Sequence, residues 1–231
     1  MRFVELFAGI GGGSLGFERA GMKCVGHCEN NEFARRVLKK HWPAVPLFAN
    51  VENIKGDEFG EFELISGGPP CQATSIAAAI QGKRTGNTLW PEMARIVKKA
   101  CPAWVVVEQP IKNKAWETKV KEDLEELGYT VSRLQLAAFQ FGAPHIRWRV
   151  FIIANTLRIR CDTWNRPARP PEVKKIAWPT PPRGAWRETG ARYNRMDDGF
   201  RHWVDRVRCL GNALVPQIAE YIGRCIMDTN T

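Results

Sequence analysis

The chain has 231 residues, of which 44% are hydrophobic, enough to bury one substantial core but not two full domains. Its formal net charge of +10 and isoelectric point near 9.5 favour a polyanionic partner. No apolar run approaches the ~20 residues that cross a bilayer, and the N-terminus lacks the regions of a signal peptide, so we expect a cytosolic protein with no membrane partner.

Cysteine usage fits a reducing compartment. An odd number of cysteines without a secretory signal argues against a disulfide framework, and most should be reduced and buried. Cys24 and Cys28 are close in sequence, but no second Cys or His pair completes a zinc site, so we expect no metal. The seven cysteines are Cys24, Cys28, Cys71, Cys101, Cys161, Cys209 and Cys225.

Predicted strands and helices alternate along most of the chain. The strands are expected at residues 4–7, 24–28, 62–66, 104–107, 130–137 and 149–154, and the helices at 15–21, 32–41, 90–100, 114–127 and 211–227. The β-branched run Val105-Val106-Val107 is typical of a strand covered on both faces. We therefore predict an α/β fold with a Rossmann-like, doubly wound, mostly parallel sheet, whose ligands bind beyond the carboxyl ends of the strands.

The segment 155–205 interrupts this alternation with clusters of proline. Residues 155–208 carry thirteen Lys and Arg against six Asp and Glu, together with Trp164, Trp178, Trp186 and Trp203. Basic side chains interleaved with planar ones suit phosphate contact and base stacking, although a solvated basic surface explains the composition equally well. We predict a catalytic domain made of residues 1–154 and 206–231, with 155–205 as a small, loop-rich recognition segment.

A glycine-rich loop follows the first predicted strand. Gly11-x-Gly13-x-x-Gly16 matches a dinucleotide-type fingerprint, and Glu29 follows about 20 residues later, where a carboxylate can bind ribose hydroxyls. A glycine loop alone also occurs in ordinary tight turns. The order strand, loop, helix, strand and acid favours a nucleoside-containing cofactor.

Three further motifs fall where predicted strands begin or end. In Gly68-Pro69-Pro70-Cys71-Gln72, two prolines fix the backbone ahead of a thiol, which becomes a nucleophile if its pKa is lowered. Glu108 ends a buried strand, where a carboxylate is costly unless it is paired or has a task. Arg147 and Arg149 flank one residue and therefore point to the same side of a strand. The ordinary alternatives are a buried inert cysteine and an exposed arginine pair.

These motifs, in this order, resemble those of the cytosine-C5 DNA methyltransferases. The resemblance rests on residues 7–12, 70–72, 108, 145–149 and 211–213 and covers roughly 1–154 and 205–225. It implies a catalytic domain that binds S-adenosylmethionine, with the last helix packed against the cofactor half and a recognition domain between the last two motifs. The expected partner is double-stranded DNA, bound by a monomer. The short recognition segment suits a phage-encoded or orphan enzyme.

The resemblance also assigns roles to individual residues. Cys71 matches the nucleophile that attacks C6 of cytosine, Glu108 the acid that contacts N3 and the exocyclic amine, and Arg147 and Arg149 the pair that orients both. The cofactor-binding positions are Phe7, Gly9, Gly11, Gly12, Glu29, Asn30, Asn50, Pro70, Leu89, Asn212 and Ala213. The expected DNA-binding positions are Gln72, Ser75, Lys83, Arg84, Arg183, Arg187, Arg192 and Arg195, with the loop 72–88 as a lid over a flipped base.

The chain departs from the family pattern beside the reacting groups. Glu108-Gln109-Pro110 stands where Glu-Asn-Val is usual, Thr74 replaces an aromatic, and His145 stands where Gln is common. Three other functions compete with the DNA enzyme. They are an RNA cytosine-C5 methyltransferase, a catalytically silent DNA-binding relative and an NAD-type oxidoreductase, the last supported by the glycine loop alone.

Overall fold

The computed structural model describes residues 1–70, 88–111, 113–142, 147–159, 161, 164 and 213–229. Its strands are β1 (Arg2–Leu6), β2 (Lys23–Cys28), β3 (Leu47–Phe48), β4 (Leu64–Gly67), β5 (Trp104–Pro110), β6 (Thr130–Ala137) and β7 (Trp148–Asn155). Its helices are α1 (Gly12–Arg19), α2 (Glu32–His41), α4 (Trp90–Ala100), α5 (Lys114–Glu126) and α8 (Pro216–Asp228), with short 3-10 helices η1 (Val51–Asn53) and η2 (Ala138–Phe141).

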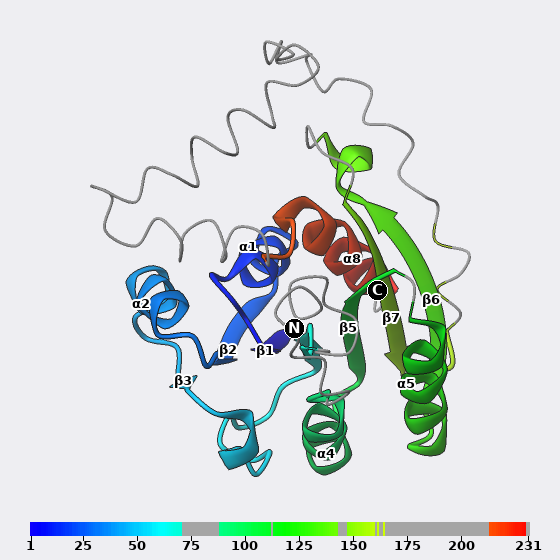
Figure 1. Ribbon diagram of the computed structural model, residues 1–231, viewed down its shortest axis with the longest axis horizontal. Coiled ribbons are helices and arrows are strands. Elements are labelled where there is room, and N and C mark those ends of the chain that lie inside the picture. The colour runs from blue at the N-terminus through cyan, green and yellow to red at the C-terminus, as the bar shows by residue number, and fades with distance from the viewer. Residues whose placement is uncertain are drawn as a thin grey trace, which may run out of the picture.

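The strands of this part of the chain form one sheet in the order β3-β2-β1-β4-β5-β7-β6 (Figure 1). β7 runs antiparallel to β5 and β6, and the remaining pairs are parallel. The predicted Rossmann-like, mostly parallel fold is confirmed. The short strand β3 and the two 3-10 helices are additional to the predicted elements.

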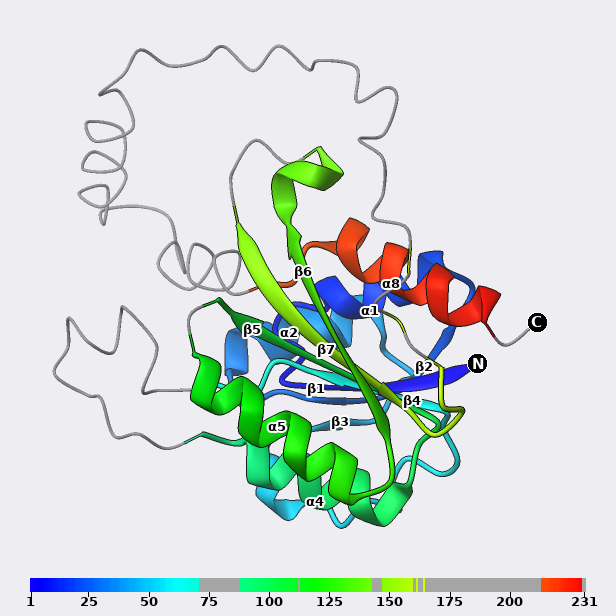
Figure 2. The ribbon, with the colours of Figure 1, turned by 90° about the vertical axis from the view of Figure 1, so that its right-hand side faces the viewer.

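Helices cover both faces of the sheet, and the strands alternate their side chains between them. In β5, Val105 and Val107 belong to one core cluster with α4 and α5, while Trp104 and Val106 belong to the other with α1 and α8 (Figure 2). All four side chains are at most 1% exposed. Burial on both faces explains why this strand reads as a continuous apolar run.

Two predicted helix starts are wrong. The helix expected from Leu15 begins at Gly12, because the carboxylate of Glu5 accepts a hydrogen bond from Ser14 N at 2.8 Å and so caps the first turn. The last helix was expected from Gly211, but residues 213–215 precede it and it begins at Pro216. Proline favours the first helical position, since its missing N–H is unpaired there in any case.

The first residues of the predicted recognition segment pack on the core of the sheet. Cys161 is buried, and Trp164 lies against the second cluster with its ring centroid 6.3 Å from that of Trp104. Base stacking was one of two interpretations of the tryptophans in this segment. The packing of Trp164 against Trp104 gives this one a role in the core.

α1 and α8 pack at unusually close range through glycine. A Cβ on Gly16 would overlap Pro216 O, and it would lie 2.5 Å from Ala219 Cβ and 2.8 Å from Glu220 N. Two of these three atoms belong to the backbone of α8, which cannot rotate away as a side chain does. The glycine at this position therefore serves helix packing.

Gly16→Ala is expected to destabilise the fold by about 1–2 kcal/mol. Alanine gains about 1 kcal/mol of helix propensity, but overpacking against a backbone costs about 1–3 kcal/mol or more. Urea unfolding of the two proteins measures the difference. Leu15→Ala is the control, because this neighbour on α1 is 38% exposed and its loss should change stability by less than about 0.5 kcal/mol. Equal stability of Gly16→Ala and wild type would contradict the tight α1–α8 contact.

Candidate active site

Most of the described site residues lie at one edge of the sheet. β1, β2, β4 and β5 end there with their carboxyl termini, and the antiparallel strand β7 begins there. This brings the loop after β1, Glu29 after β2, the turn after β4 and Glu108 in β5 to the same side of the molecule. Parallel strands bind ligands at this edge because the loops converge there.

Glu108 and Arg149 form an ion pair across β5 and β7. In the register of the two strands Glu108 faces Phe151 and Pro110 faces Arg149, so the paired residues are diagonal neighbours on one face. Arg149 Nε lies 2.6 Å from Glu108 Oε1, and both side chains are less than one-fifth exposed. Neither atom has an ideally aligned hydrogen bond within the described residues, and both atoms are buried, so the attraction between them is mainly electrostatic.

Burial raises the pKa of Glu108, and the positive charges of Arg149 and Arg147 oppose the rise. Arg147 lies just before β7, where its carbonyl accepts a hydrogen bond from Ala138 N at 3.1 Å. Because the effect of burial is larger than that of the two arginines, the Glu108 carboxyl group holds its proton to higher pH than an exposed glutamate does. Such a group can donate a hydrogen bond as well as accept one.

The turn after β4 is fixed against this acid. A Cβ on Gly68 would lie 3.0 Å from Glu108 Oε2, so the acid lies close over the turn. Gln109 Nε2 donates a hydrogen bond to Pro69 O, and Leu89 N donates one to Pro70 O at 3.3 Å. Gln109 thus supplies an amide donor beside the acid where the family pattern has asparagine.

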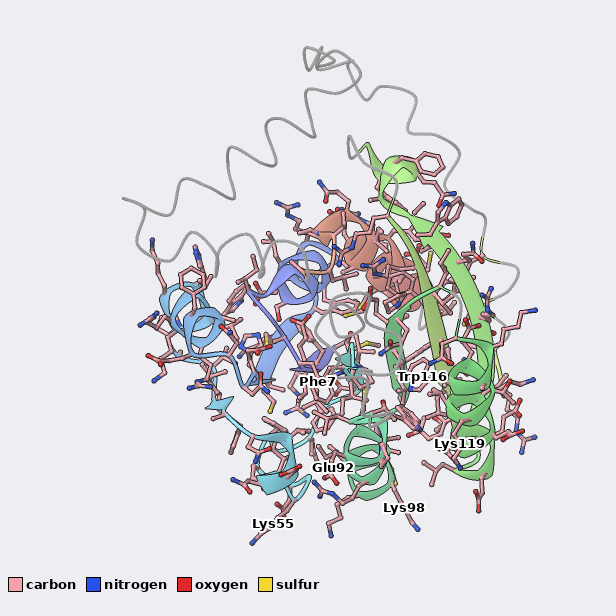
Figure 3. All side chains as sticks on the ribbon, viewed as in Figure 1. Phe7, Lys55, Glu92, Lys98, Trp116 and Lys119 are labelled. Carbon is pink, nitrogen blue, oxygen red and sulfur yellow. The ribbon has the colours of Figure 1, made fainter. Side chains whose placement is uncertain are left out.

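The loop after β1 has a backbone shape that few residues adopt. Phe7 has φ 55°, in the left-handed region that is costly for a residue with a side chain. Gly9 and Gly11 also have positive φ. Glu29 fixes this loop by accepting a hydrogen bond from Gly9 N at 2.7 Å through Oε2 and one from Asn31 N at 2.8 Å through Oε1. Phe7 directly follows β1 and is half-buried, near the middle of the view in Figure 3.

Gly12 makes room for the segment that precedes α8. A Cβ on Gly12 would overlap Leu214 O and lie 3.2 Å from Leu214 C. Ala213, the other described residue of the last predicted cofactor motif, directly precedes Leu214. The close approach therefore places the segment before α8 against the glycine loop.

A buried polar cluster beneath the loop was missed by the sequence prediction. Glu5 is 5% exposed and accepts hydrogen bonds from the backbone N–H and the hydroxyl of Ser14. Ser14 Oγ lies 2.7 Å from His27 Nε2, which is 3.3 Å from Cys24 Sγ. The signal in the sequence was an acid inside the apolar strand Phe3-Val4-Glu5-Leu6, where an unpaired charge would be costly.

Glu5 gives the protein a specific dependence of stability on pH. Burial raises the pKa of Glu5 from 4.5 to about 7, against the hydrogen bonds of Ser14. Between these values the folded state holds a proton that the unfolded state releases, so the stability contribution of Glu5 falls as pH rises, by roughly 3 kcal/mol in total. Burial lowers the pKa of His27 to about 4, which acts in the opposite direction below about pH 6.5.

Glu5→Gln is therefore expected to gain stability relative to wild type as pH rises from 5 to 8. Both proteins retain His27, so its contribution largely cancels in the comparison. Unfolding free energies at the two pH values measure the change. Glu61→Gln is the control, because the side chain of Glu61 is 94% exposed and its loss should not alter the pH dependence. A constant difference between wild type and Glu5→Gln across this range would show that Glu5 stays ionised.

Three further predicted cofactor residues flank the loops at this edge. Asn50 is exposed and caps η1, with its side-chain oxygen accepting a hydrogen bond from Glu52 N at 3.0 Å. Asn30 is exposed, and its carbonyl accepts a hydrogen bond from Arg35. Leu89 is half-buried at the start of α4. The structure thus brings Phe7, Gly9, Gly11, Gly12, Glu29, Pro70, Glu108, Arg147, Arg149 and Ala213 to one edge, and Asn50 to its periphery.

The remaining predicted residues lie outside the described part of the chain. The catalytic candidate is Cys71, and the cofactor candidate is Asn212. The DNA-binding candidates are Gln72, Ser75, Lys83, Arg84, Arg183, Arg187, Arg192 and Arg195. Their roles stay predictions.

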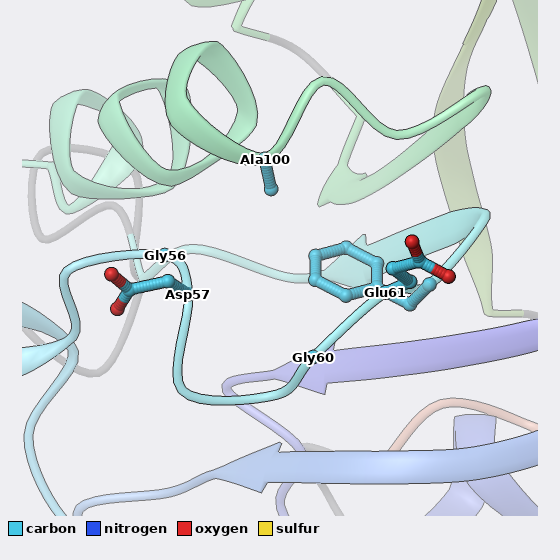
Figure 4. Close-up of a pocket in the computed structure, with 6 residues that line it drawn as sticks. Gly56, Asp57, Gly60, Glu61 and Ala100 are labelled. Atoms are coloured by element: carbon cyan, nitrogen blue, oxygen red, sulfur yellow. The ribbon is translucent and has the colours of Figure 1, made fainter.

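A hollow in the surface lies apart from this edge. It is found where β4 and β5 begin, at the opposite edge of the sheet, and is lined by Gly56, Asp57, Gly60, Glu61, Phe62 and Ala100 (Figure 4). It has no cluster of buried polar groups, so it is a surface depression. None of the described helices combines the length and apolarity needed to cross a membrane.

Relatives of known function match much of the chain. A family model described as C-5 cytosine-specific DNA methylase matches residues 1–183. The type II methyltransferase M.NlaIV of Neisseria lactamica is 31% identical over 199 residues, covering 76% of this chain and 46% of its own. M.HhaI of Haemophilus parahaemolyticus is 30% identical over 176 residues, covering 72% and 53%. The chain thus spans about half the length of these relatives.

Solved structures agree with the fold. The DNMT2 of Spodoptera frugiperda superposes with a TM-score of 0.56 at 20% identity, covering 67% of this chain and 49% of that one. The Dnmt2 methyltransferase of S. pombe superposes with a TM-score of 0.55 at 19% identity, covering 70% and 52%. Because the family model matches residues 1–183 of the 231 in this chain, the chain belongs to the C-5 cytosine-specific DNA methylase family.

Proposed function

We propose that the chain is a DNA cytosine-C5 methyltransferase that uses S-adenosylmethionine and acts on a cytosine flipped out of duplex DNA. The observation that carries the proposal is the buried pair of Glu108 and Arg149, set against the Gly68-Pro69-Pro70 turn that leads directly to Cys71. An acid and a cation at one sheet edge, with a thiol next in sequence after the turn beside them, match the needs of cytosine chemistry in a member of this family.

The glycine loop fits a cofactor without phosphate. In dinucleotide-binding folds the pyrophosphate sits at the N-terminus of the helix that follows the loop. Here the carboxylate of Glu5 occupies the first turn of α1 and accepts the hydrogen bond of Ser14 N. A pyrophosphate there would find this backbone donor already bound to Glu5, so the NAD-type alternative is disfavoured. S-adenosylmethionine carries no phosphate and has a cationic sulfonium.

The residues proposed to hold the cofactor surround that loop. Phe7 would lie beside the adenosyl group, Gly9, Gly11 and Gly12 would form the methionine side, and the free lone pairs of Glu29 would accept the ribose hydroxyls. The remaining proposed positions are Asn30, Asn50, Pro70, Leu89, Asn212 and Ala213. When bound, S-adenosylmethionine supplies an electrophilic methyl group for C5.

The protein's own groups would make C5 a nucleophile. The Cys71 thiolate adds to C6, and the electron pair of the C5=C6 bond moves to C5 while N3 takes a proton or hydrogen bond from Glu108. Arg149 and Arg147 stabilise negative charge that develops on the base and the thiolate. After C5 has gained the methyl group, N3 returns its proton to Glu108 and a base removes the C5 proton, so that the C5=C6 bond re-forms as the S–C6 bond breaks and Cys71 leaves as the thiolate.

DNA contacts are proposed for residues on the two segments that flank the catalytic edge in sequence. Gln72, Ser75, Lys83 and Arg84 follow the thiol and would close over the flipped base. Arg183, Arg187, Arg192 and Arg195 would contact phosphates or guanine edges from the recognition segment. We propose that the protein binds as a monomer, with residues 155–205 as the recognition segment.

A methyl-transfer assay tests the proposal. The purified protein is incubated with methyl-labelled S-adenosylmethionine and either unmethylated duplex DNA or RNA, and the digested nucleosides are identified by mass spectrometry. We expect labelled 5-methylcytosine from DNA. Label confined to RNA would assign the chain to the RNA reaction. Cofactor binding without transfer to either polymer would identify a silent DNA-binding relative.

A further inference from the structure

An aromatic side chain stands exposed beside the catalytic edge. Among the described residues the exposed large hydrophobics are Leu15, Phe139 and Leu157, and of these Phe139 alone is aromatic. Phe139 is 42% exposed, and its ring meets Trp148 edge to face at 5.6 Å between centroids. An exposed aromatic of this size offers a flat apolar face to a ligand.

The local structure holds Phe139 in this position. Ala138 before it is fully buried, and Gln140 after it accepts a hydrogen bond from Ala137 N at 2.7 Å. Phe141 packs on Tyr221 of α8 at 5.6 Å. The 3-10 helix η2 is thus anchored on both sides of Phe139, and its ring points outward from a fixed base.

This position lies at the same sheet edge as the proposed catalytic groups. Ala137 pairs with Trp148 where β6 ends and β7 begins, and Ala138 N donates to Arg147 O. Trp148 and Arg149 are consecutive in β7, so the ring pair of Trp148 and Phe139 faces away from the side on which Arg149 meets Glu108. η2 projects past the ends of the strands, at the top of β6 and β7 (Figure 2).

We propose that Phe139, supported by Trp148, stacks on an unpaired base of the DNA substrate. The inference rests on the proposed function, because flipping a cytosine leaves bases unpaired and unstacked next to the active site. Every base has a π face, and aromatic side chains bind unpaired bases by stacking without regard to sequence. The net charge of +10 attracts the phosphates that accompany such a base.

The test compares binding to two labelled duplexes that differ by one C·A mismatch, which lowers the cost of unpairing. Phe139→Ala is expected to lose about tenfold in affinity for the mismatched duplex, with a smaller change for the paired duplex. The slope of affinity against salt should stay as in wild type, since no phosphate contact is removed. Phe139→Trp should restore the preference. Leu157→Ala is the matched control, because Leu157 is 47% exposed beyond the opposite end of β7.

The outcomes separate this inference from the proposed function. If wild type transfers methyl groups to DNA but Phe139→Ala keeps the full mismatch preference, the stacking role is wrong and the function stands. If wild type transfers none, the proposed function fails on its own assay. A lower melting temperature of Phe139→Ala with unchanged DNA binding would show that the chain itself covers the ring. A dimer of the wild type that is lost in Phe139→Ala, measured by sedimentation, would identify a second copy of the chain as the partner of the ring. Each of these last two results would overturn the inference.

Discussion

Cys71→Ala is expected to abolish methyl transfer, by roughly 10⁴-fold or more, while binding of S-adenosylmethionine stays close to wild type. Cytosine C5 does not attack a methyl donor unaided, because the ring draws electron density away from it. Only addition of a nucleophile to C6 turns C5 into an enamine-like carbon. Without the thiol, the remaining groups can hold the base but cannot activate it.

The turn that precedes Cys71 in sequence is held in place by three contacts. Gly68 lies against Glu108, Pro69 O accepts a hydrogen bond from Gln109, and Pro70 O accepts one from Leu89 N. The chain therefore reaches Cys71 from a turn that is fixed against the acid. Two prolines restrict the same turn, which reduces the conformational freedom to be lost when the base binds.

Single-turnover transfer of labelled methyl groups to DNA measures the effect, and cofactor binding is followed separately by calorimetry. Cys101→Ala is the control, because Cys101 is exposed at the end of α4, just before the start of β5 and far along that strand from Glu108. Its activity should remain near wild type. Substantial transfer by Cys71→Ala would remove the covalent adduct from the mechanism.

Strand positions were the most predictable part of the fold, because their signals are local. Val105-Val106-Val107 indicated a doubly covered strand, and its neighbours in the core confirm it. The alternation of strand side chains also predicted that Arg147 and Arg149 would share a side. Arg149 meets Glu108 on one face of the sheet, and this contact depends on the antiparallel register of β5 and β7. The periodicity of the sequence does not determine that register, so the contact could not be predicted.

The glycine loop shows why the rest could not be predicted. A fingerprint of glycines indicated close approach of a ligand, but Gly12 makes room for Leu214 just before α8 and Gly16 for the backbone of α8, about 200 residues later in the chain. Glu5 likewise stabilises the first turn of α1 from the strand below. These contacts join segments that are distant in sequence, and no local pattern records which partner comes close.

Glu108→Gln is expected to lower the rate of methyl transfer by roughly 10²–10⁴-fold, the range for loss of a general acid. Glutamine keeps the shape of the side chain and its ability to reach the base, but it cannot pass a proton to N3. Binding of S-adenosylmethionine should change little, because the cofactor loop is fixed by Glu5 and Glu29 rather than by Glu108.

The pH profile distinguishes proton donation from simple positioning. Burial raises the pKa of Glu108 against the charges of Arg149 and Arg147, so the protonated form persists to higher pH than in an exposed glutamate. Wild-type activity should fall as pH rises through this pKa, and the residual activity of Glu108→Gln should lack that limb. Transfer rates across the pH range measure both.

Glu117→Gln supplies the matched control for this prediction. Glu117 pairs with Arg133 at 2.6 Å, the same separation as Glu108 and Arg149, and its side chain is 12% exposed against 18% for Glu108. It lies on α5, outside the proposed site, so its loss tests the cost of breaking a comparable acid–arginine pair. Equal losses of activity in the two variants would show that Glu108 only supports the fold. A loss confined to Glu108→Gln, with the alkaline limb removed, assigns the proton to Glu108.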